Sequence, residues 1–156
     1  LPVLHRVFPD ATIAITHRDP VSVIQSAATM LAYGQRMNRR RVDLQGLIDY
    51  WSDRVAHLLD ACTADRDAVP ESQSIDVLFH EFMADTDGKL DEIYRTYGMS
   101  RTERSRGEQA AFLEAHPRGK GGRVRYDLEG QFGTKPEVVR ERFGFYFERF
   151  PVRTES

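Results

Sequence analysis

The sequence predicts an α/β protein in which parallel strands are covered by helices. Two short apolar runs, residues 12–16 and 75–80, have the length of strands, and a long stretch with helical periodicity separates them. Strands joined by such a helical crossover pair in parallel. Because a two-stranded parallel sheet is too small to be stable alone, we expect further strands from an absent N-terminal half or from a partner chain.

The composition favours one soluble domain that comprises residues 1–156. Apolar residues make up 40% of the chain and charged residues 29%, and no segment reaches the roughly 20 apolar residues of a membrane span. A net charge of −2 gives no general affinity for nucleic acid. The single Cys62 excludes an internal disulfide and fits a cytoplasmic protein, and the histidines lack the spacing of a metal site.

The first part of the chain is expected to contain a helix end, a strand and a long helix. Apolar residues at helical spacing over residues 1–7 and a Pro-Asp turn precede the strand at 12–16. Asp19 as N-cap and Pro20 in the first turn begin a helix. We expect this helix to end at about Tyr33, because Gly34 is a typical C-terminal stop.

The remaining elements follow from apolar periodicity and from glycine or proline boundaries. They are a basic linker at 35–43, a helix at 44–64 with Trp51 and Cys62 on its apolar face, a polar loop at 64–74, the strand at 75–80, helices at 87–97 and 102–115, a glycine-rich basic loop at 119–133 and a final helix at 136–150. Gly98 is expected to end the helix at 87–97.

A candidate anion site lies where the first strand gives way to the following helix. Arg18 precedes the helix, and Ser22 and Ser26 follow at intervals of four residues. Free backbone N–H groups and the positive end of the helix dipole favour an anion there. A guanidinium and one or two hydroxyls at that place make a receptor for phosphate. The alternative is that these residues only cap the helix, and that the neighbouring His17 only packs or hydrogen-bonds.

A second candidate is the loop His116-Pro-Arg118-Gly119-Lys120-Gly-Gly-Arg-Val-Arg-Tyr126. Its glycines allow a close approach of the backbone to a ligand, and its basic residues supply positive charge. Such a loop can hold a phosphate through its N–H groups. The alternative is a flexible, solvated loop.

Four segments in order resemble bacterial members of the broad sulfotransferase family. They read FPDATIAITHRDPVSVIQS, HEFMADTDGKLDEIYRTYG, HPRGKGGRVRYDLEGQFG and VRERFGFYFERF. The resemblance covers essentially the whole chain. It implies that residues 1–156 are the C-terminal part of a single sulfotransferase domain. The implied fold has three layers and is related to the P-loop NTPases, with a parallel sheet that lacks its N-terminal strands here.

The resemblance also implies a function and a set of binding residues. Such enzymes move a sulfuryl group from 3′-phosphoadenosine-5′-phosphosulfate (PAPS) to a hydroxyl or amine of a small acceptor. By this likeness Arg18 and Ser26, with Ser22 as a weaker candidate, bind the 3′-phosphate of PAPS or of its product PAP. The segment Arg118-Gly119-Lys120 closes over it, although the family order is Arg-Lys-Gly. For Glu81 and Asp85, which lie in the second of these segments, the resemblance implies a structural role.

The family's 5′-phosphosulfate loop and its catalytic base would both precede Leu1, so we expect residues 1–156 to be inactive alone. His5 is too close to Arg18 to be that base. One alternative is a non-catalytic nucleotide-binding or interaction module that uses an exposed sheet edge. A nucleic-acid binder that uses the arginine clusters is disfavoured by the net charge. Homo-oligomerisation and the nature of the acceptor stay open.

Overall fold

The computed structural model describes residues 1–117, 122 and 126–155. Its sheet consists of β1 (Ile13–His17) and β2 (Ser74–Leu78), which pair in parallel from Ile13 opposite Ser74 to His17 opposite Leu78. The predicted parallel α/β arrangement is therefore confirmed. The second strand ends two residues earlier than expected, because Phe79 already begins a helix.

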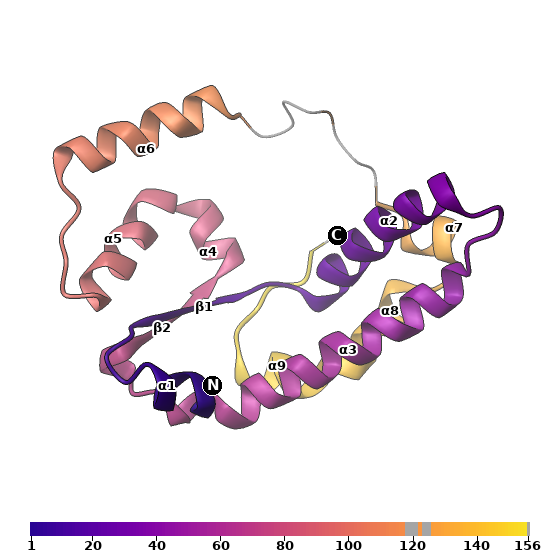
Figure 1. Cartoon of the computed structure of the whole chain (residues 1–156), viewed down its shortest axis with the longest axis horizontal. Coiled ribbons are helices and arrows are strands. Elements are labelled where there is room, and N and C mark those ends of the chain that lie inside the picture. The colour runs from indigo at the N-terminus through magenta and orange to yellow at the C-terminus, as the bar shows by residue number, and fades with distance from the viewer. Residues whose placement is uncertain (118–121, 123–125, 156) are drawn as a thin grey trace.

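Helices lie on both sides of the two strands (Figure 1). They are α1 (Pro2–Val7), α2 (Pro20–Asn38), α3 (Leu44–Asp65), α4 (Phe79–Ala84), α5 (Thr86–Thr96), α6 (Glu103–Ala115), α7 (Leu128–Phe132), α8 (Pro136–Arg140) and α9 (Gly144–Arg149), with 3₁₀ turns at Arg66–Ala68, Glu71–Gln73 and Glu141–Phe143. Helices α4 and α5 pack against β2, whereas side chains of α9 and of the turn after α3 reach the opposite face. Among the described residues no helix is long and apolar enough to cross a membrane.

Helix α2 begins as predicted but does not end at Gly34. The Asp19 carboxylate accepts a hydrogen bond of 3.0 Å from the Val21 N–H and so caps the first turn. The helix continues through Gly34 to Asn38, and only at Arg39 does the backbone become extended. Packing of α2 along α3 outweighs the low helix propensity of one glycine. The linker to α3 is consequently restricted to residues 39–43.

Two further expectations about the C-terminal third were wrong. The predicted helix at 136–150 is divided into α8, a 3₁₀ turn and α9, and the second break falls at Gly144. The predicted loop at 119–133 ends in the short helix α7, which Asp127 caps at its start and Gly133, with φ of 69°, ends. A five-residue helix is too short for apolar periodicity to reveal it, so these two boundary residues were the available signal.

The buried core lies between α2, α3, α7 and the α8–α9 segment rather than around the strands. Its members are Val21, Ile24, Ala28, Ala32, Ile48, Leu128, Phe132, Val139 and Phe143. Trp51 packs against this cluster while partly exposed. Cys62 is free and half-buried.

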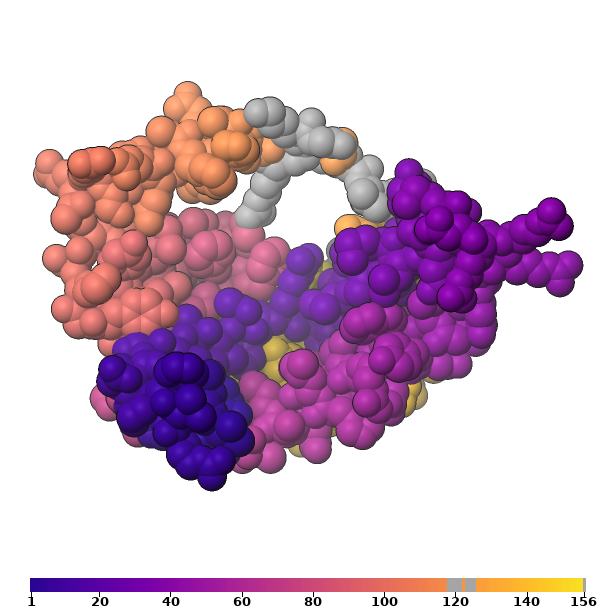
Figure 2. Space-filling model, in the orientation of Figure 1, coloured from indigo at the N-terminus to yellow at the C-terminus, as the bar shows by residue number. Residues whose placement is uncertain are grey.

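The two ends of the molecule differ in how they pack. Helix α1 contains no buried residue and lies on the surface at one end, whereas the linker at 39–43 projects at the other end (Figure 2). Between α4 and α5, Asp85 caps α5 by accepting from the Gly88 N–H at 2.9 Å, and Glu81 pairs with Lys89 at 2.7 Å. Glu81 and Asp85 therefore make the structural contacts that the sequence predicts.

Candidate functional site

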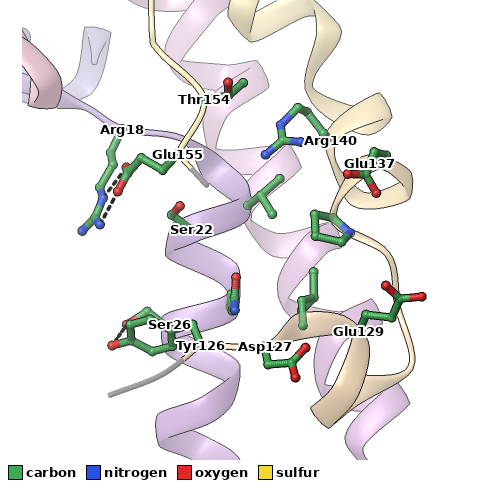
Figure 3. A pocket seen from close by; sticks show the side chains of 14 residues that line it. Arg18, Ser22, Ser26, Tyr126, Asp127, Glu129, Glu137, Arg140, Thr154 and Glu155 are labelled. Carbon is green, nitrogen blue, oxygen red and sulfur yellow. Dashed lines mark hydrogen bonds and ion pairs between the residues drawn. The ribbon is translucent and has the colours of Figure 1, made fainter. Parts of the chain in front are cut away.

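A cleft of about 600 Å³ opens at the carboxyl end of β1, where the chain enters α2. Its walls come from the first turns of α2, from residues 126–129, from α8 and from the extended C-terminal segment at 154–155 (Figure 3). The volume is within the range of clefts that hold small ligands, about 300–1,000 Å³. The cleft therefore lies at the place where the sequence predicts an anion site.

Arg18, Ser22 and Ser26 all line this cleft (Figure 3). Ser22 and Ser26 are four residues apart in α2, so they lie on successive turns of the same helix face. Arg18, just before the N-cap Asp19, is 43% exposed and so accessible to a ligand. The other predicted binding residues, Arg118, Gly119 and Lys120, lie outside the described residues.

Tyr126 connects the end of the glycine-rich loop to α2. The Ser26 hydroxyl donates a hydrogen bond of 3.2 Å to the Tyr126 hydroxyl. The next residue, Asp127, caps α7 by accepting from the Gly130 N–H at 2.8 Å. Tyr126, at the described end of the loop, therefore contacts the face of α2 that lines the cleft.

The Arg18 guanidinium has two partners that the sequence reading missed. Its Nε and Nη2 donate to the two carboxylate oxygens of Glu155 at 2.7 and 2.6 Å, and its Cζ lies 4.1 Å from the centre of the Phe79 ring. Hydrogen bonding to Glu155 raises the pKa of Arg18 against the opposing effect of burial. The guanidinium is thus held in the two-pronged geometry in which arginine also binds phosphate.

Asp19 is fully buried, and its carboxylate accepts hydrogen bonds from three parts of the cleft wall. Besides the Val21 N–H, its carboxylate accepts from Arg140 Nη2 at 3.2 Å and from the Glu155 backbone N–H at 2.9 Å. The start of α2, helix α8 and the C-terminal segment therefore meet at one charged group. A buried carboxylate needs such partners, because an unpaired charge would be costly.

The charge around the cleft is mixed. Among its described lining residues the guanidiniums of Arg18 and Arg140 face a larger number of carboxylates, which belong to Asp127, Glu129, Glu137 and Glu155. An anion in the cleft must therefore be held by close, directed donors rather than by a positive field. Arg18 lies directly before the N-terminus of α2, and its side chain is more exposed than that of Arg140.

His17 is buried and makes the packing and hydrogen-bond contacts that the sequence predicts for it. It bonds to Asp76 and Tyr146 and stacks on Phe150, with the ring centres 4.1 Å apart. No group of three or more metal-ligating side chains occurs among the described residues.

The strand, the N-capped helix and the cleft define an α/β protein with a cleft at a strand–helix junction. The family model described as "Sulfotransferase family" matches residues 1–103, which include Arg18, Ser22 and Ser26. The chain therefore belongs to the sulfotransferase family. Comparison with curated proteins gives no match.

Solved structures of two mycobacterial sulfotransferases share this fold. The chain is similar to sulfotransferase STF9 from Mycobacterium avium, with a TM-score of 0.82 and 22% identity over 98% of this chain and 39% of that one. It is also similar to sulfotransferase STF1 from Mycobacterium tuberculosis H37Rv, with a TM-score of 0.67 and 22% identity over 90% of this chain and 35% of that one. The chain thus spans less than two-fifths of either protein.

Proposed function

We propose that this protein is a sulfotransferase that moves a sulfuryl group from PAPS to a hydroxyl or amine of a small acceptor. In this proposal residues 1–156 carry the part of the site that holds the 3′-phosphate of the donor. The observation that supports it most strongly is that Arg18, directly before α2, and Ser22 and Ser26 on α2 all line one cleft. Membership of the sulfotransferase family agrees with it.

Each of the three residues has a distinct part in the proposed phosphate site. Arg18 supplies a charged, two-pronged donor beside the positive end of the α2 dipole. Ser22, in the first turn, adds a hydroxyl close to the exposed backbone N–H groups. Ser26 lies a turn further on, so it contacts the ligand only if the nucleotide lies along the helix.

The glycine-rich loop completes the proposed site. Arg118, Gly119 and Lys120 would close over the phosphate, by the family likeness. The described contact between Tyr126 and Ser26 at 3.2 Å supports this, because it holds one end of the loop at α2. A closed loop would add the positive charge that the described wall of the cleft lacks.

In the reaction, a base deprotonates the acceptor, whose oxygen or nitrogen attacks sulfur in line with the departing phosphate oxygen. The sulfur–oxygen bond to the nucleotide breaks, and the leaving PAP carries the negative charge. Holding the donor at its 3′-phosphate fixes the direction of attack, which lowers the entropic part of the barrier. Residues 1–156 are assigned this positioning of the donor and no proton transfer.

The test is the affinity for PAP of the variant Arg18→Ala in the full-length protein. We expect binding to weaken by about 1.5–3 kcal/mol, the contribution of a hydrogen bond to a charged group, as measured by titration calorimetry. Arg39→Ala is the matched control, because Arg39 is an exposed arginine at the far end of the same helix and should leave affinity unchanged. Equal affinity of Arg18→Ala and wild type would remove Arg18 from the site.

Adenosine 5′-phosphate, which lacks the 3′-phosphate, separates phosphate recognition from recognition of the rest of the nucleotide. Wild-type protein should bind PAP more tightly than adenosine 5′-phosphate. Arg18→Ala should weaken PAP selectively and so reduce this preference. A wild-type protein without the preference would overturn the proposed 3′-phosphate site.

A further inference from the structure

The far end of α2 carries a group of arginines whose charge no described carboxylate neutralises. One lies in the last turn of α2 and three follow before α3, and together we call them the basic tip: Arg36, Arg39, Arg40 and Arg41. All four are exposed, and within the described part of the chain none of them forms an ion pair. Exposed arginines elsewhere do so, since Arg54, Arg104 and Arg149 each pair with a carboxylate.

The charge of the basic tip is local. Residues 36–43 contain these four arginines and one carboxylate, Asp43, which caps α3 by accepting from the Gly46 N–H at 2.9 Å. The whole of residues 1–156 carries a net charge of only −2. Arg36 suits the negative end of the α2 dipole, but this effect falls off within the last turn. The dipole therefore does not account for the three arginines that follow the helix.

An apolar stripe runs along α2 to the basic tip. It consists of Met30, Tyr33 and Met37, which are spaced by three and four residues and so share one face of the helix. Their side chains are 68%, 67% and 68% exposed. A different face of α2 carries the core residues Ala28 and Ala32. A helix that is apolar on two faces is typical of one that is covered on both, so the apolar stripe is suited to a further contact.

Positive charge beside exposed apolar side chains is complementary to the surface of an anionic lipid bilayer. Arginines contact the charged headgroups, apolar side chains enter the boundary between headgroups and acyl chains, and tyrosine is enriched at that depth. The linker at 39–43 also projects from the body of the molecule (Figure 2). A flat, deformable bilayer accommodates such a projection, whereas a folded partner needs a matching concavity. Nucleic acid would contact the arginines and leave the apolar stripe in water.

We propose that the basic tip and the apolar stripe bind the surface of an anionic lipid bilayer. The arginines supply the attraction to negatively charged headgroups, and Tyr33 and Met37 supply the apolar contact beside them. No residue of the tip or the stripe lines the cleft at the start of α2. The inference is therefore independent of the proposed phosphate site, and either can fail without the other.

The test is the binding of the full-length protein to lipid vesicles, measured by sedimentation. We expect wild type to bind vesicles of phosphatidylserine mixed equally with phosphatidylcholine, and not vesicles of phosphatidylcholine alone. The triple variant Arg39→Gln, Arg40→Gln, Arg41→Gln should bind the mixed vesicles more weakly, by about fivefold for each arginine removed. Added salt should also weaken wild-type binding, because it screens exposed charges.

The matched control removes three exposed arginines that are scattered over the molecule. They are Arg6 on α1, Arg95 on α5 and Arg142 in the 3₁₀ turn before α9. Replacing them by glutamine changes the net charge equally, so vesicle binding should stay at the wild-type level. Equal losses in the two triple variants would overturn the proposal, because binding would then follow the overall charge and not the basic tip.

Tyr33→Gln with Met37→Gln separates apolar insertion from the attraction of charge. Both side chains are exposed and glutamine favours a helix, so the midpoint of urea unfolding should stay unchanged. We expect the double variant to bind the mixed vesicles about tenfold more weakly, because apolar area no longer enters the bilayer. Leu58→Gln, which changes a side chain of α3 that is 67% exposed, is the control and should bind like wild type. Unchanged binding of the double variant would overturn the assigned contact of the apolar stripe.

Two other occupants give different results. Binding of double-stranded DNA through Arg39, Arg40 and Arg41, without vesicle binding, would assign the basic tip to nucleic acid and overturn the proposal. A wild-type dimer that becomes a monomer in the Tyr33→Gln, Met37→Gln variant, without vesicle binding, would assign the stripe to a second copy of the chain and overturn it equally. Selective binding to the anionic vesicles that depends on both the tip and the stripe would support it.

Discussion

At the scale of single residues, the most informative contact is the pair between Arg18 and Glu155. It uses Nε and Nη2 of the guanidinium, at 2.7 and 2.6 Å, which are atoms that a phosphate would also use. The same acidic residue is anchored through its backbone N–H to Asp19. A carboxylate is thus held where an incoming anion would compete with it.

Glu155→Gln should therefore increase the affinity for PAP. The amide keeps the size of the side chain and removes the negative charge, while the anchoring backbone N–H is unaffected. The pair is partly exposed, with Arg18 at 43% and Glu155 at 31%, so the gain should be modest, about two- to fivefold. Calorimetry checks this, with Glu137→Gln in the opposite wall of the cleft as the control. Weaker binding by Glu155→Gln would instead show that Glu155 supports the phosphate site.

At the scale of elements, helix α2 is longer than its own sequence suggests. Gly34 lies inside the helix without a positive φ, and a Cβ built on it meets nothing within 4 Å. The glycine therefore has no steric role, and it adds conformational freedom to the unfolded chain. Gly133 is the opposite case, since it ends α7 with φ of 69°.

Gly34→Ala should stabilise the protein by about 0.5–1 kcal/mol, because alanine favours the helix and restricts the unfolded chain. Gly133→Ala should destabilise it, because alanine is strained at positive φ. The midpoint of urea unfolding measures both changes. A loss of stability in Gly34→Ala would mean that the helix requires flexibility at this residue.

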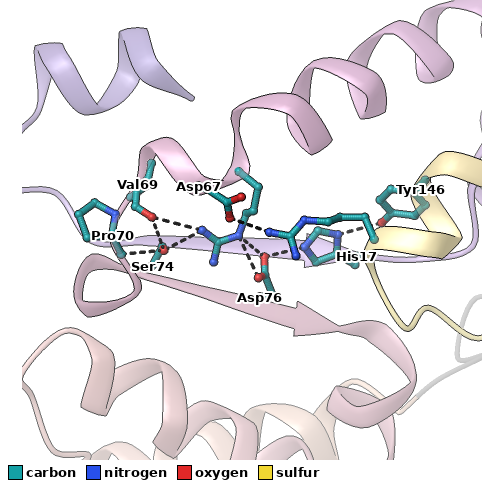
Figure 4. A network of polar contacts seen from close by, with 9 residues as sticks. His17, Asp67, Val69, Pro70, Ser74, Asp76 and Tyr146 are labelled. Carbon is teal, nitrogen blue, oxygen red and sulfur yellow. Dashed lines mark hydrogen bonds and ion pairs between the residues drawn. The ribbon is translucent and has the colours of Figure 1, made fainter.

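At the scale of the whole molecule, hydrogen bonds through Arg66, Asp76, His17 and Tyr146 join the turn after α3, both strands and α9 (Figure 4). Burial disfavours the charged form of Asp76, but hydrogen bonds from Arg66 and His17 outweigh this and lower its pKa below the usual 3.8. A carboxylate with a lowered folded pKa stabilises the protein above its unfolded pKa. That stabilisation is lost as the pH falls through the folded value.

Asp76→Asn should therefore destabilise the protein most at neutral pH and progressively less below about pH 4. The free energy of unfolding in urea, measured at pH 7 and pH 3 for wild type and variant, tests the sign. Asp67→Asn is the control, because Asp67 is 85% exposed in its pair with Arg149. A difference between wild type and Asp76→Asn that stays constant with pH would exclude Asp76 as the titrating group.

The sequence by itself determined the parts that depend on neighbouring residues. Apolar runs and the Asp19-Pro20 start predicted the parallel strands and the beginning of α2, because strand length and helix capping are local properties. The same reasoning put Arg18 directly before this helix, and Ser22 and Ser26 near its start. Arg118, Gly119 and Lys120 lie outside the described residues, so their role stays a prediction.

Only the tertiary structure decided what surrounds Arg18. Glu155 lies 137 residues away from it in the chain, Tyr126 lies 100 residues from Ser26, and Tyr146 lies 129 residues from His17. No local pattern brings such residues together, since their contact depends on how α7, α9 and the C-terminal segment pack on α2 and the strands. Packing likewise carried α2 past Gly34 and divided the last predicted helix at Gly144.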